Sequence, residues 1–570
     1  MPNLNMPSNR TRAVRVCEYC HSHKIRCDLD TKHDECSNCS ERGELCKIRT
    51  RKLYSSRVRT ARRDNDIEHV NHEEGLEGAP TPTGSTVNPV ELVATCFPAP
   101  SSRVIPIFVG NGDYGAIISS TAKTNERHFH VPVPAENTLA PEDLQYLKLK
   151  GCFTLPPESS ELITAYFRFV HPIFPVIDGT SFLHEYNAHG VSGVNLLLLW
   201  SMFSVSASFI PTLDRKQCKV KYSYRAKLLF DLSEERDKIV LIQSALLLSF
   251  WFADFEDVKQ SWYWTGVAFA IGQTLGMHRD AKQVLGTTGS ERSSALWRIV
   301  WKCCMIRDVW LAFTMGRPIR INSADCDPFP REDPSIHFKD LTLHGEVLYT
   351  PEEAVKIGRL WQSFCTAADV LRESSTKILS PSRVKLLKLR LEDEIKVTTS
   401  ADFTHISWHC RLHHYVALIA LARNSKAQGD IRNLSDSITA TIQEYSAESP
   451  LIMPAPFIIP LVVPALISYF HGLSSADPGK MEAYGQIDIL LSFFDANKDN
   501  YPAAGNLHRV FTTWRNTMQA QTTSLPARDV LHSIPTNQMQ FPENSPWFGS
   551  QLSWPGQGSS PASNGSSDIQ

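Results

Sequence analysis

Six of the 14 cysteines in this 570-residue chain fall within 30 residues and follow a repeated spacing. In order they read C-x2-C-x6-C-x8-C-x2-C-x6-C, so the unit C-x2-C-x6-C occurs twice. A C-x2-C pair places two thiolates on one metal within a single turn, and six more residues suffice to bring back a third. These cysteines are Cys17, Cys20, Cys27, Cys36, Cys39 and Cys46.

Zinc is the metal that this pattern favours. Residues 1–15 are polar and basic and do not resemble a signal peptide, so we expect a reducing compartment in which clustered thiols bind metal. Three thiolates per half leave each tetrahedral zinc one ligand short, but six cysteines can serve two zincs if two of them bridge. A piece this short cannot build a hydrophobic core. Metal binding must therefore supply its folding energy, roughly 10–16 kcal/mol per structural zinc site.

The spacing resembles the fungal zinc binuclear cluster family of transcription factors. The resemblance implies two Zn²⁺ per chain, with Cys17 and Cys36 as the bridging ligands. It also implies a nuclear protein whose partner is double-stranded DNA, and it assigns Lys24 to a CGG-like triplet in the major groove. Two departures put the triplet preference in doubt: His21 and His23 stand where Arg or Lys is common, and the usual proline before the fourth cysteine is missing.

Charge predicts which half of the cluster faces DNA. Residues 21–26 carry basic side chains and no acid, whereas residues 40–45 carry two glutamates that phosphate would repel. A lysine at the end of a short helix can donate to guanine O6 and N7. The other side chains predicted to contact DNA are His23, Arg15, Arg26, Lys47, Arg49, Arg51 and Lys52.

The charge of the whole chain divides in the same way. Residues 1–63 hold 15 Lys and Arg against 7 Asp and Glu, a net charge of +8, while the remainder carries −10. A basic head on an acidic body predicts a polyanionic partner for the head alone. The basic residues of 47–63 suit phosphate contacts and nuclear import.

The expected fold is mainly α, with five parts along the chain. Residues 1–16 form a disordered basic end, 17–46 the zinc cluster, 47–140 a basic and then acidic, proline-rich linker, and 525–570 a disordered tail that could activate transcription. Residues 145–520 are expected to form an all-helical regulatory domain, because apolar residues recur at helical spacing. Clear helical stretches are 160–170, 194–210, 238–252, 260–277, 293–315, 352–374 and 403–423.

Several segments of the helical region resemble the fungal transcription factor regulatory domain, also called the middle homology region. They are 155–157, 165–178, 224–229, 275–280, 296–301, 307–308 and 316–318. Their order resembles most the subgroup of cutinase and acetamidase regulators. The resemblance implies an RNA polymerase II-type transcription factor for catabolic or secondary-metabolite genes, with co-regulators as partners and a domain that binds an effector or masks the activator.

Two long apolar runs lie in this region, at 196–211 and 450–470. The first is short and carries serines, and the second holds five prolines. We expect both to be buried segments of a protein that does not insert in a membrane. Tryptophans on helical stretches are expected in the core, and Arg279–Asp280 and Arg307–Asp308 are expected to form internal ion pairs.

Rival chemistries have weaker support. Residues 110–115 match G-x-G-x-x-G after an apolar run at 104–109, so a nicotinamide-binding enzyme is one alternative, but Pro106 is expected to interrupt the strand that such a fold needs. His409 and His413 share a helix face, although a core role is expected for them. RNA binding is a further alternative, yet the cluster has only Tyr19 as a base-stacking aromatic. We therefore expect no enzymatic activity.

The oligomeric state stays open in the sequence. A triplet recurs too often in a genome to define a site by itself. Ile67 and Val70 begin a possible coiled-coil seam, but Gly75 and Pro80 end it. The chain is therefore expected either to bind as a monomer aided by its basic tail or to form a homodimer through the helical domain.

Overall fold

The computed structural model describes residues 17–23, 25, 27–28, 35–43, 46–47, 104–108, 128–132, 139–232, 237–250, 260–285, 291–328, 333–376, 378–399, 404–424, 429–448, 457–474 and 480–524. The chain divides into two compact units, residues 1–82 and residues 83–570. The predicted disordered ends, 1–16 and 525–570, and most of the predicted linker lie outside the described residues.

The first unit has two short helices, α1 (Glu18–Ser22) and α2 (Ser37–Arg42). Among its described residues, the buried apolar side chains are all cysteines, and only Tyr19, Ile25 and Cys46 pack partly against them. No aliphatic core is present among its described residues, so the sulfur cluster occupies the place of a core. Gly43 ends α2 with a φ of 63°, a left-handed conformation that suits glycine.

The second unit is helical. Its first helices are α5 (Pro141–Leu149), α6 (Ser159–Ala165), α7 (Gly179–His189), α8 (Leu196–Ser206), α9 (Arg215–Leu232), α10 (Lys238–Leu248), α11 (Ser261–Leu275), α12 (Ala281–Leu285) and α13 (Glu291–Met315). The later ones are α14 (Pro351–Thr376), α15 (Pro381–Thr399), α16 (Thr404–Asn424), α17 (Gly429–Glu448), α18 (Val463–Ser474), α19 (Lys480–Asn497) and α20 (Pro502–Ser524). Short helical turns are η1 (Tyr166–Val170), η2 (Gly190–Gly193), η3 (Ala207–Phe209), η5 (Ser323–Asp325), η6 (Pro334–His337) and η7 (Ile459–Val462).

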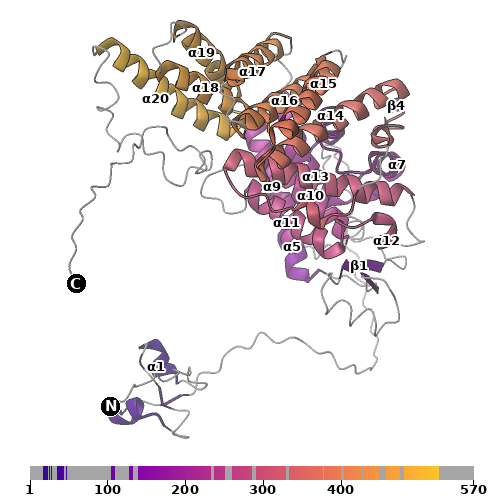
Figure 1. The fold of residues 1–570 in the computed structure, drawn as a ribbon. Helices are drawn as coiled ribbons and strands as arrows, with labels where there is room; N and C mark the ends of the chain where they lie inside the picture. Colours follow the sequence, from indigo (N-terminus) through magenta and orange to yellow (C-terminus); the bar gives the residue numbers. More distant parts are fainter. Residues whose placement is uncertain are drawn as a thin grey trace, which may run out of the picture. The chain divides into compact units, whose positions relative to one another are not determined.

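One continuous apolar core runs through these helices. Helix α8 is central, because all eleven of its residues are buried and it packs against α9 and α10. From α16 onward each helix packs against the next along the chain, so α16 to α20 form an ordered stack in which neighbours in sequence are neighbours in space (Figure 1). The core therefore joins the early helices to the late ones.

The predicted helices are confirmed. All seven predicted helical stretches coincide with α6 and η1, α8 and η3, α10, α11, α13, α14 and α16. Pro351 opens α14, since a proline at the first helical position has no N–H to leave unpaired. Gly316 ends α13 with a φ of 61°. Of the predicted core tryptophans, Trp200, Trp264, Trp297, Trp301, Trp310 and Trp361 are buried, Trp262 is half-buried, and Trp251 lies outside the described residues.

One structured element falls within the predicted linker. Strand β1 (Val104–Phe108) pairs antiparallel with β2 (His128–Pro132) and lies against α11. Ile105 packs on the core, and the Phe108 ring lies 4.9 Å from the ring of His278. The expectation that Pro106 interrupts the strand is wrong, because in a two-stranded sheet a proline is tolerated where its nitrogen faces away from the partner strand. A second small hairpin joins β3 (Thr342–Leu343) and β4 (Glu346–Val347).

The expected internal ion pairs form only in part. Arg279 pairs with Asp327 at 2.9 Å. Arg307 instead donates to the hydroxyl and carbonyl oxygens of Ser249, at 2.9 and 2.6 Å. Asp308 accepts the backbone N–H groups of residues 320 and 321. Successive residues on a helix point in different directions, so neighbours in sequence rarely pair.

The apolar run at 196–211 forms the buried helix α8, as predicted. Among the described residues no single helix is long and apolar enough to cross a bilayer. The segments Gly179–Gly193 and Leu196–Phe209 meet the length and composition test only as a pair, which is bent by 109°.

Several histidines lie fully inside this core. His171, His413 and His414 are at most 1% exposed. Burial lowers the pKa of His413 to about 3 and that of His171 and His414 to about 4. In the unfolded chain a histidine titrates near 6.5. Between pH 6.5 and 4 the unfolded chain therefore binds more protons than the folded chain, so the helical domain loses stability as the pH falls through this window.

We predict that the full-length variant His413→Phe has a shallower loss of unfolding free energy between pH 6 and 4. Removing one buried neutral histidine should reduce the slope by up to about 1.4 kcal/mol per pH unit. Tryptophan fluorescence during urea unfolding measures this, since all 12 tryptophans follow residue 199. His184→Phe is the control because that side chain is 79% exposed. Equal slopes for His413→Phe and the wild type would show that His413 does not contribute.

Candidate metal centre

The two halves of the cysteine cluster fold in the same way. Each begins with a buried cysteine directly before a short helix, Cys17 before α1 and Cys36 before α2. The backbone N–H of Cys17 donates to the sulfur of Cys27 at 3.5 Å. In the second half the backbone N–H of Cys36 donates to the sulfur of Cys46 at 3.3 Å. The sequence repeat C-x2-C-x6-C is therefore also a structural repeat.

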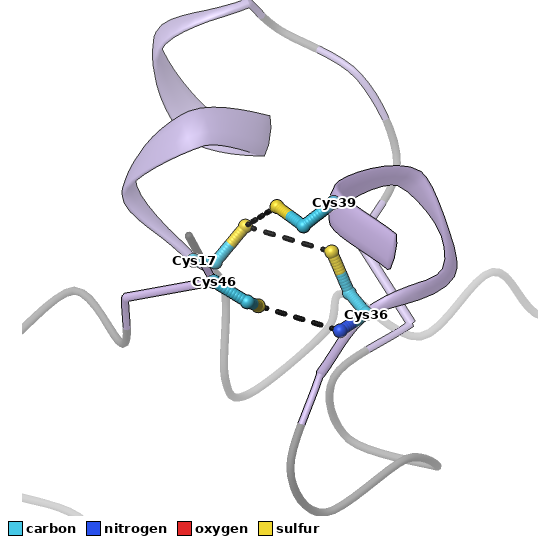
Figure 2. Close-up of side chains that lie close together, drawn as sticks. All are labelled: Cys17, Cys36, Cys39 and Cys46. Carbon is cyan, nitrogen blue, oxygen red and sulfur yellow. Dashed lines mark hydrogen bonds between the residues drawn. The ribbon is translucent and has the colours of Figure 1, made fainter. Parts of the chain in front are cut away.

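Sulfurs from the two halves lie close together, and Figure 2 shows Cys17 of the first half beside Cys36 and Cys39 of the second. The sulfur of Cys17 lies 3.7 Å from that of Cys36 and 3.6 Å from that of Cys39. The sulfur of Cys20 lies 3.6 Å from that of Cys36. A tetrahedral zinc with bonds of about 2.3 Å separates its sulfur ligands by about 3.8 Å, so these spacings fit the metal.

The six sulfurs form two overlapping groups of four. One group is Cys17, Cys20, Cys27 and Cys36, and the other is Cys17, Cys36, Cys39 and Cys46, with all ligand atoms of a group within 4.8 Å of one another. Cys17 and Cys36 belong to both groups. These are the only groups of potential metal ligands found in the part of the chain that the structure describes. Two four-sulfur sites that share two members use six thiolates for two metal ions.

The electrostatic interactions among the close sulfurs favour the binding of a cation. Burial raises the pKa of the Cys36 thiol, but hydrogen bonds from the backbone N–H of Cys39 and from neighbouring thiols outweigh it and lower that pKa to about 6. Burial and the same neighbours raise the pKa of Cys20 and Cys39 well above the usual range. Not all six thiols can ionise together without positive charge between them, and a divalent metal supplies that charge.

Polar contacts outside the sulfurs hold the two helices together. Asp28 accepts the backbone N–H of Ser37 at 2.9 Å and its hydroxyl at 2.5 Å, which anchors the start of α2. The Asn38 amide donates to the sulfur of Cys20 at 3.7 Å, and such contacts orient a ligand. Sequence reasoning did not identify Asp28 or Asn38. The one sequence signal for the contact of Asp28 with Ser37 is that an acidic residue directly follows the third cysteine.

A second link joins α1 to α2 through Tyr19. The Arg42 guanidinium donates to the Tyr19 hydroxyl at 3.3 Å, and the Tyr19 ring stacks on His23 at 4.2 Å between centroids. The two helices are thereby linked by side chains as well as by sulfur. Tyr19 is thus committed within the module.

Two of the predicted DNA-contact residues are described. His23 is exposed at the end of α1, and its Nδ1 lies 3.0 Å from the carbonyl oxygen of Tyr19. Lys47 is exposed directly after the last cysteine of the cluster. The other predicted contacts, Lys24, Arg26, Arg15, Arg49, Arg51 and Lys52, lie outside the described residues.

The described residues give no support to the rival sites. The motif at 110–115 lies outside the described residues, but the strand before it, β1, pairs antiparallel, whereas dinucleotide binding needs a parallel βαβ unit. His409, Cys410 and His413 are buried, as expected for core residues. Cys410 donates to the carbonyl oxygen of Leu360 at 3.4 Å, and the rings of the two histidines pack 4.2 Å apart.

Comparison with known families agrees with both parts of the chain. Residues 15–55 match the fungal Zn(2)-Cys(6) binuclear cluster domain, and residues 163–340 match the fungal specific transcription factor domain. The first is a zinc-binding domain, so the cysteine cluster is a zinc site. No solved structure matches the chain.

Curated relatives are regulators of transcription. Cutinase transcription factor 1 beta of Fusarium vanettenii is 32% identical over 206 residues, which cover 34% of this chain and 23% of that protein. Cutinase transcription factor 1 alpha of the same fungus is 28% identical over 385 residues, 56% of this chain and 41% of that protein. The acetamidase regulatory protein of Aspergillus fumigatus is 33% identical over 213 residues, 34% of this chain and 27% of that protein.

The chain thus spans less than half the length of each of these three relatives. They are nevertheless the regulators of cutinase and of acetamidase, the subgroup that the order of the helical segments predicted. The chain therefore contains matches to two domains, the fungal Zn(2)-Cys(6) binuclear cluster domain and the fungal specific transcription factor domain.

Proposed function

We propose that the protein is a zinc-dependent, sequence-specific DNA-binding regulator of RNA polymerase II transcription that acts in the nucleus on metabolic genes. The observation that carries this proposal is the pair of four-sulfur groups that share Cys17 and Cys36. A module with no aliphatic core among its described residues needs the metal to hold its two helices. The matched domains and the regulator relatives support the same assignment.

Six cysteine thiolates would hold two Zn²⁺ ions. Cys20 and Cys27 would hold one ion, Cys39 and Cys46 would hold the other, and Cys17 and Cys36 would belong to both sites. When bound, the ions supply charge neutralisation and a fixed geometry. The chain's own contribution is to orient α1, because the contacts of Asp28 with Ser37 and of Arg42 with Tyr19 set its position against α2.

Lys24 is the second residue after the end of α1 in the sequence and is proposed to read guanine in a CGG-like triplet. His23, Arg26 and Arg15 approach the backbone beside it, and the basic run Lys47, Arg49, Arg51 and Lys52 follows phosphates away from the triplet. A lysine that donates to base edges confers sequence preference, whereas phosphate contacts confer affinity and salt dependence.

RNA binding has little support from the module. Single-stranded RNA is read mainly by bases stacked on aromatic side chains. Tyr19 is the single aromatic residue of 17–46 other than histidine, and its ring and hydroxyl are already engaged by His23 and Arg42. Duplex DNA is therefore the proposed partner, and co-regulators are proposed partners of the helical domain. One-to-one or two-to-one stoichiometry on DNA decides between the monomer and the homodimer.

Zinc content tests the ligand assignment. The purified full chain should carry two zinc ions by inductively coupled plasma mass spectrometry. Cys17→Ser removes a ligand from both sites and should lose both ions, while Cys27→Ser removes a ligand from one site and should lose at least one. Cys218→Ser, outside the cluster, should keep two. A wild-type content of one or none, or two ions retained in Cys17→Ser, contradicts shared ligands.

Binding to short duplexes tests the role of Lys24. Lys24→Met should weaken binding to a CGG-containing duplex about 5- to 150-fold and leave binding to a scrambled duplex nearly unchanged. Lys47→Met is the matched substitution at a proposed phosphate contact. It should weaken binding to both duplexes equally and reduce the slope of log K against log salt concentration by about one.

Fluorescence anisotropy at several salt concentrations measures both effects. The assignment of Lys24 is wrong if Lys24→Met lowers affinity for the two duplexes equally.

A further inference from the structure

A cavity lies between the early and the late helices of the second unit. Its cavity volume is about 90 Å³, within a wider region of about 880 Å³ that includes open solvent. Helices α8, α9, α11 and α13 supply one side, and η7 with the start of α20 supplies the other. The first group belongs to the matched transcription factor domain and the second lies beyond residue 340, so the cavity joins two parts of the chain that are distant in sequence.

Two cations line this cavity. Arg307, on α13, is 7% exposed, and Lys219, on α9, is 3% exposed. Arg307 binds Ser249 through Nε and Nη2, and its Nη1 makes no hydrogen bond within the described part of the chain. The ammonium group of Lys219 donates to the carbonyl and side-chain oxygens of Asn500.

The charged side chains described in the cavity lining are all cationic. The described residues that line it include no aspartate or glutamate. Asp308, beside Arg307 in sequence, is occupied with the backbone N–H groups of residues 320 and 321. Helices α11 and α20 both begin at the cavity, with Ser261 and Pro502 in its lining, and the amino end of a helix carries partial positive charge.

Burial makes these cations costly in the protein alone. It lowers the pKa of Arg307 to about 9. Burial and the charge of Arg215 lower the pKa of Lys219 to about 7. A bound anion would stabilise both charged forms, because it would replace the solvation that they lose.

The rest of the lining is apolar. It includes Val205, Phe250, Trp310, Leu311, Met315, Phe457 and Leu461. A cavity with a few convergent charged groups set in apolar walls is the usual form of a small-molecule site. Its charged groups select the head of a ligand and its walls accept the body.

We propose that this cavity binds a small organic anion, a carboxylate on an apolar body, with the carboxylate between Arg307 and Lys219. The ligand contacts both the matched domain and the late helices. Its binding therefore stabilises their junction, which gives the helical domain a means to respond to a metabolite. This proposal concerns binding alone and does not depend on the DNA-binding function.

Three eight-carbon probes separate the effect of the head-group charge from that of the apolar chain. Isothermal titration calorimetry of the full chain with octanoate, octanol and octylamine compares an anionic, a neutral and a cationic head on the same body. Octanoate should bind at least ~10-fold more tightly than either of the others, because hydrogen bonds to charged groups are the strong ones. Failure of octanoate to bind, or binding no tighter than that of octanol, overturns the proposal.

Matched variants locate the site. Lys219→Met and Arg307→Met should each lower the affinity for octanoate about 10- to 100-fold and change the affinity for octanol little. Lys221→Met is the same substitution on the exposed side of α9 and should change neither. If Lys219→Met and Lys221→Met lower the affinity for octanoate equally, octanoate binds outside this cavity and the assignment is overturned.

Far-ultraviolet circular dichroism shows whether each variant folds. If the two cavity variants lose their helical signal, the preference of the wild-type chain for octanoate over octanol decides the question. The assay contains no DNA, so a negative result leaves the zinc cluster and its DNA binding untouched.

Discussion

The mutual crowding of six cysteine sulfurs is the constraint on which the amino-terminal module depends. The sulfurs of Cys17, Cys20, Cys36 and Cys39 approach within 3.6 to 3.7 Å of a neighbouring sulfur, and buried cysteines lie where an aliphatic core would otherwise be. Thiolates this close repel one another, so the fold requires cations between them. The orientation of α1 is then a consequence of metal binding rather than of hydrophobic packing.

The second unit is stabilised by apolar packing rather than by metal. Its stability comes from a continuous apolar core, in which α8 is wholly buried and neutral histidines fill part of the interior. The two units thus respond to different conditions. Loss of metal removes the folding energy of the first, while acid lowers the stability of the second, because its buried histidines must take up protons to unfold. The two units are therefore thermodynamically distinct.

Much of this was predictable from the sequence. Seven helices followed from periodic apolar residues, and the cysteine spacing alone brought six side chains to one site. Other features depend on contacts between distant segments, which periodicity does not encode. The link from Asp28 to Ser37 spans nine residues, the bond from Lys219 to Asn500 spans 281, and the β1–β2 hairpin ran through a proline within an expected linker. The ion pairs expected at Arg307–Asp308 failed because adjacent helical side chains diverge.

X-ray absorption at the zinc edge on the purified full chain tests the central claim most directly. Shared thiolates require each zinc to have four sulfur neighbours at about 2.3 Å and a second zinc within about 4 Å. The account predicts both shells. Nitrogen or oxygen in the first shell, or four sulfurs with no neighbouring metal, would contradict a cluster in which Cys17 and Cys36 bind both ions.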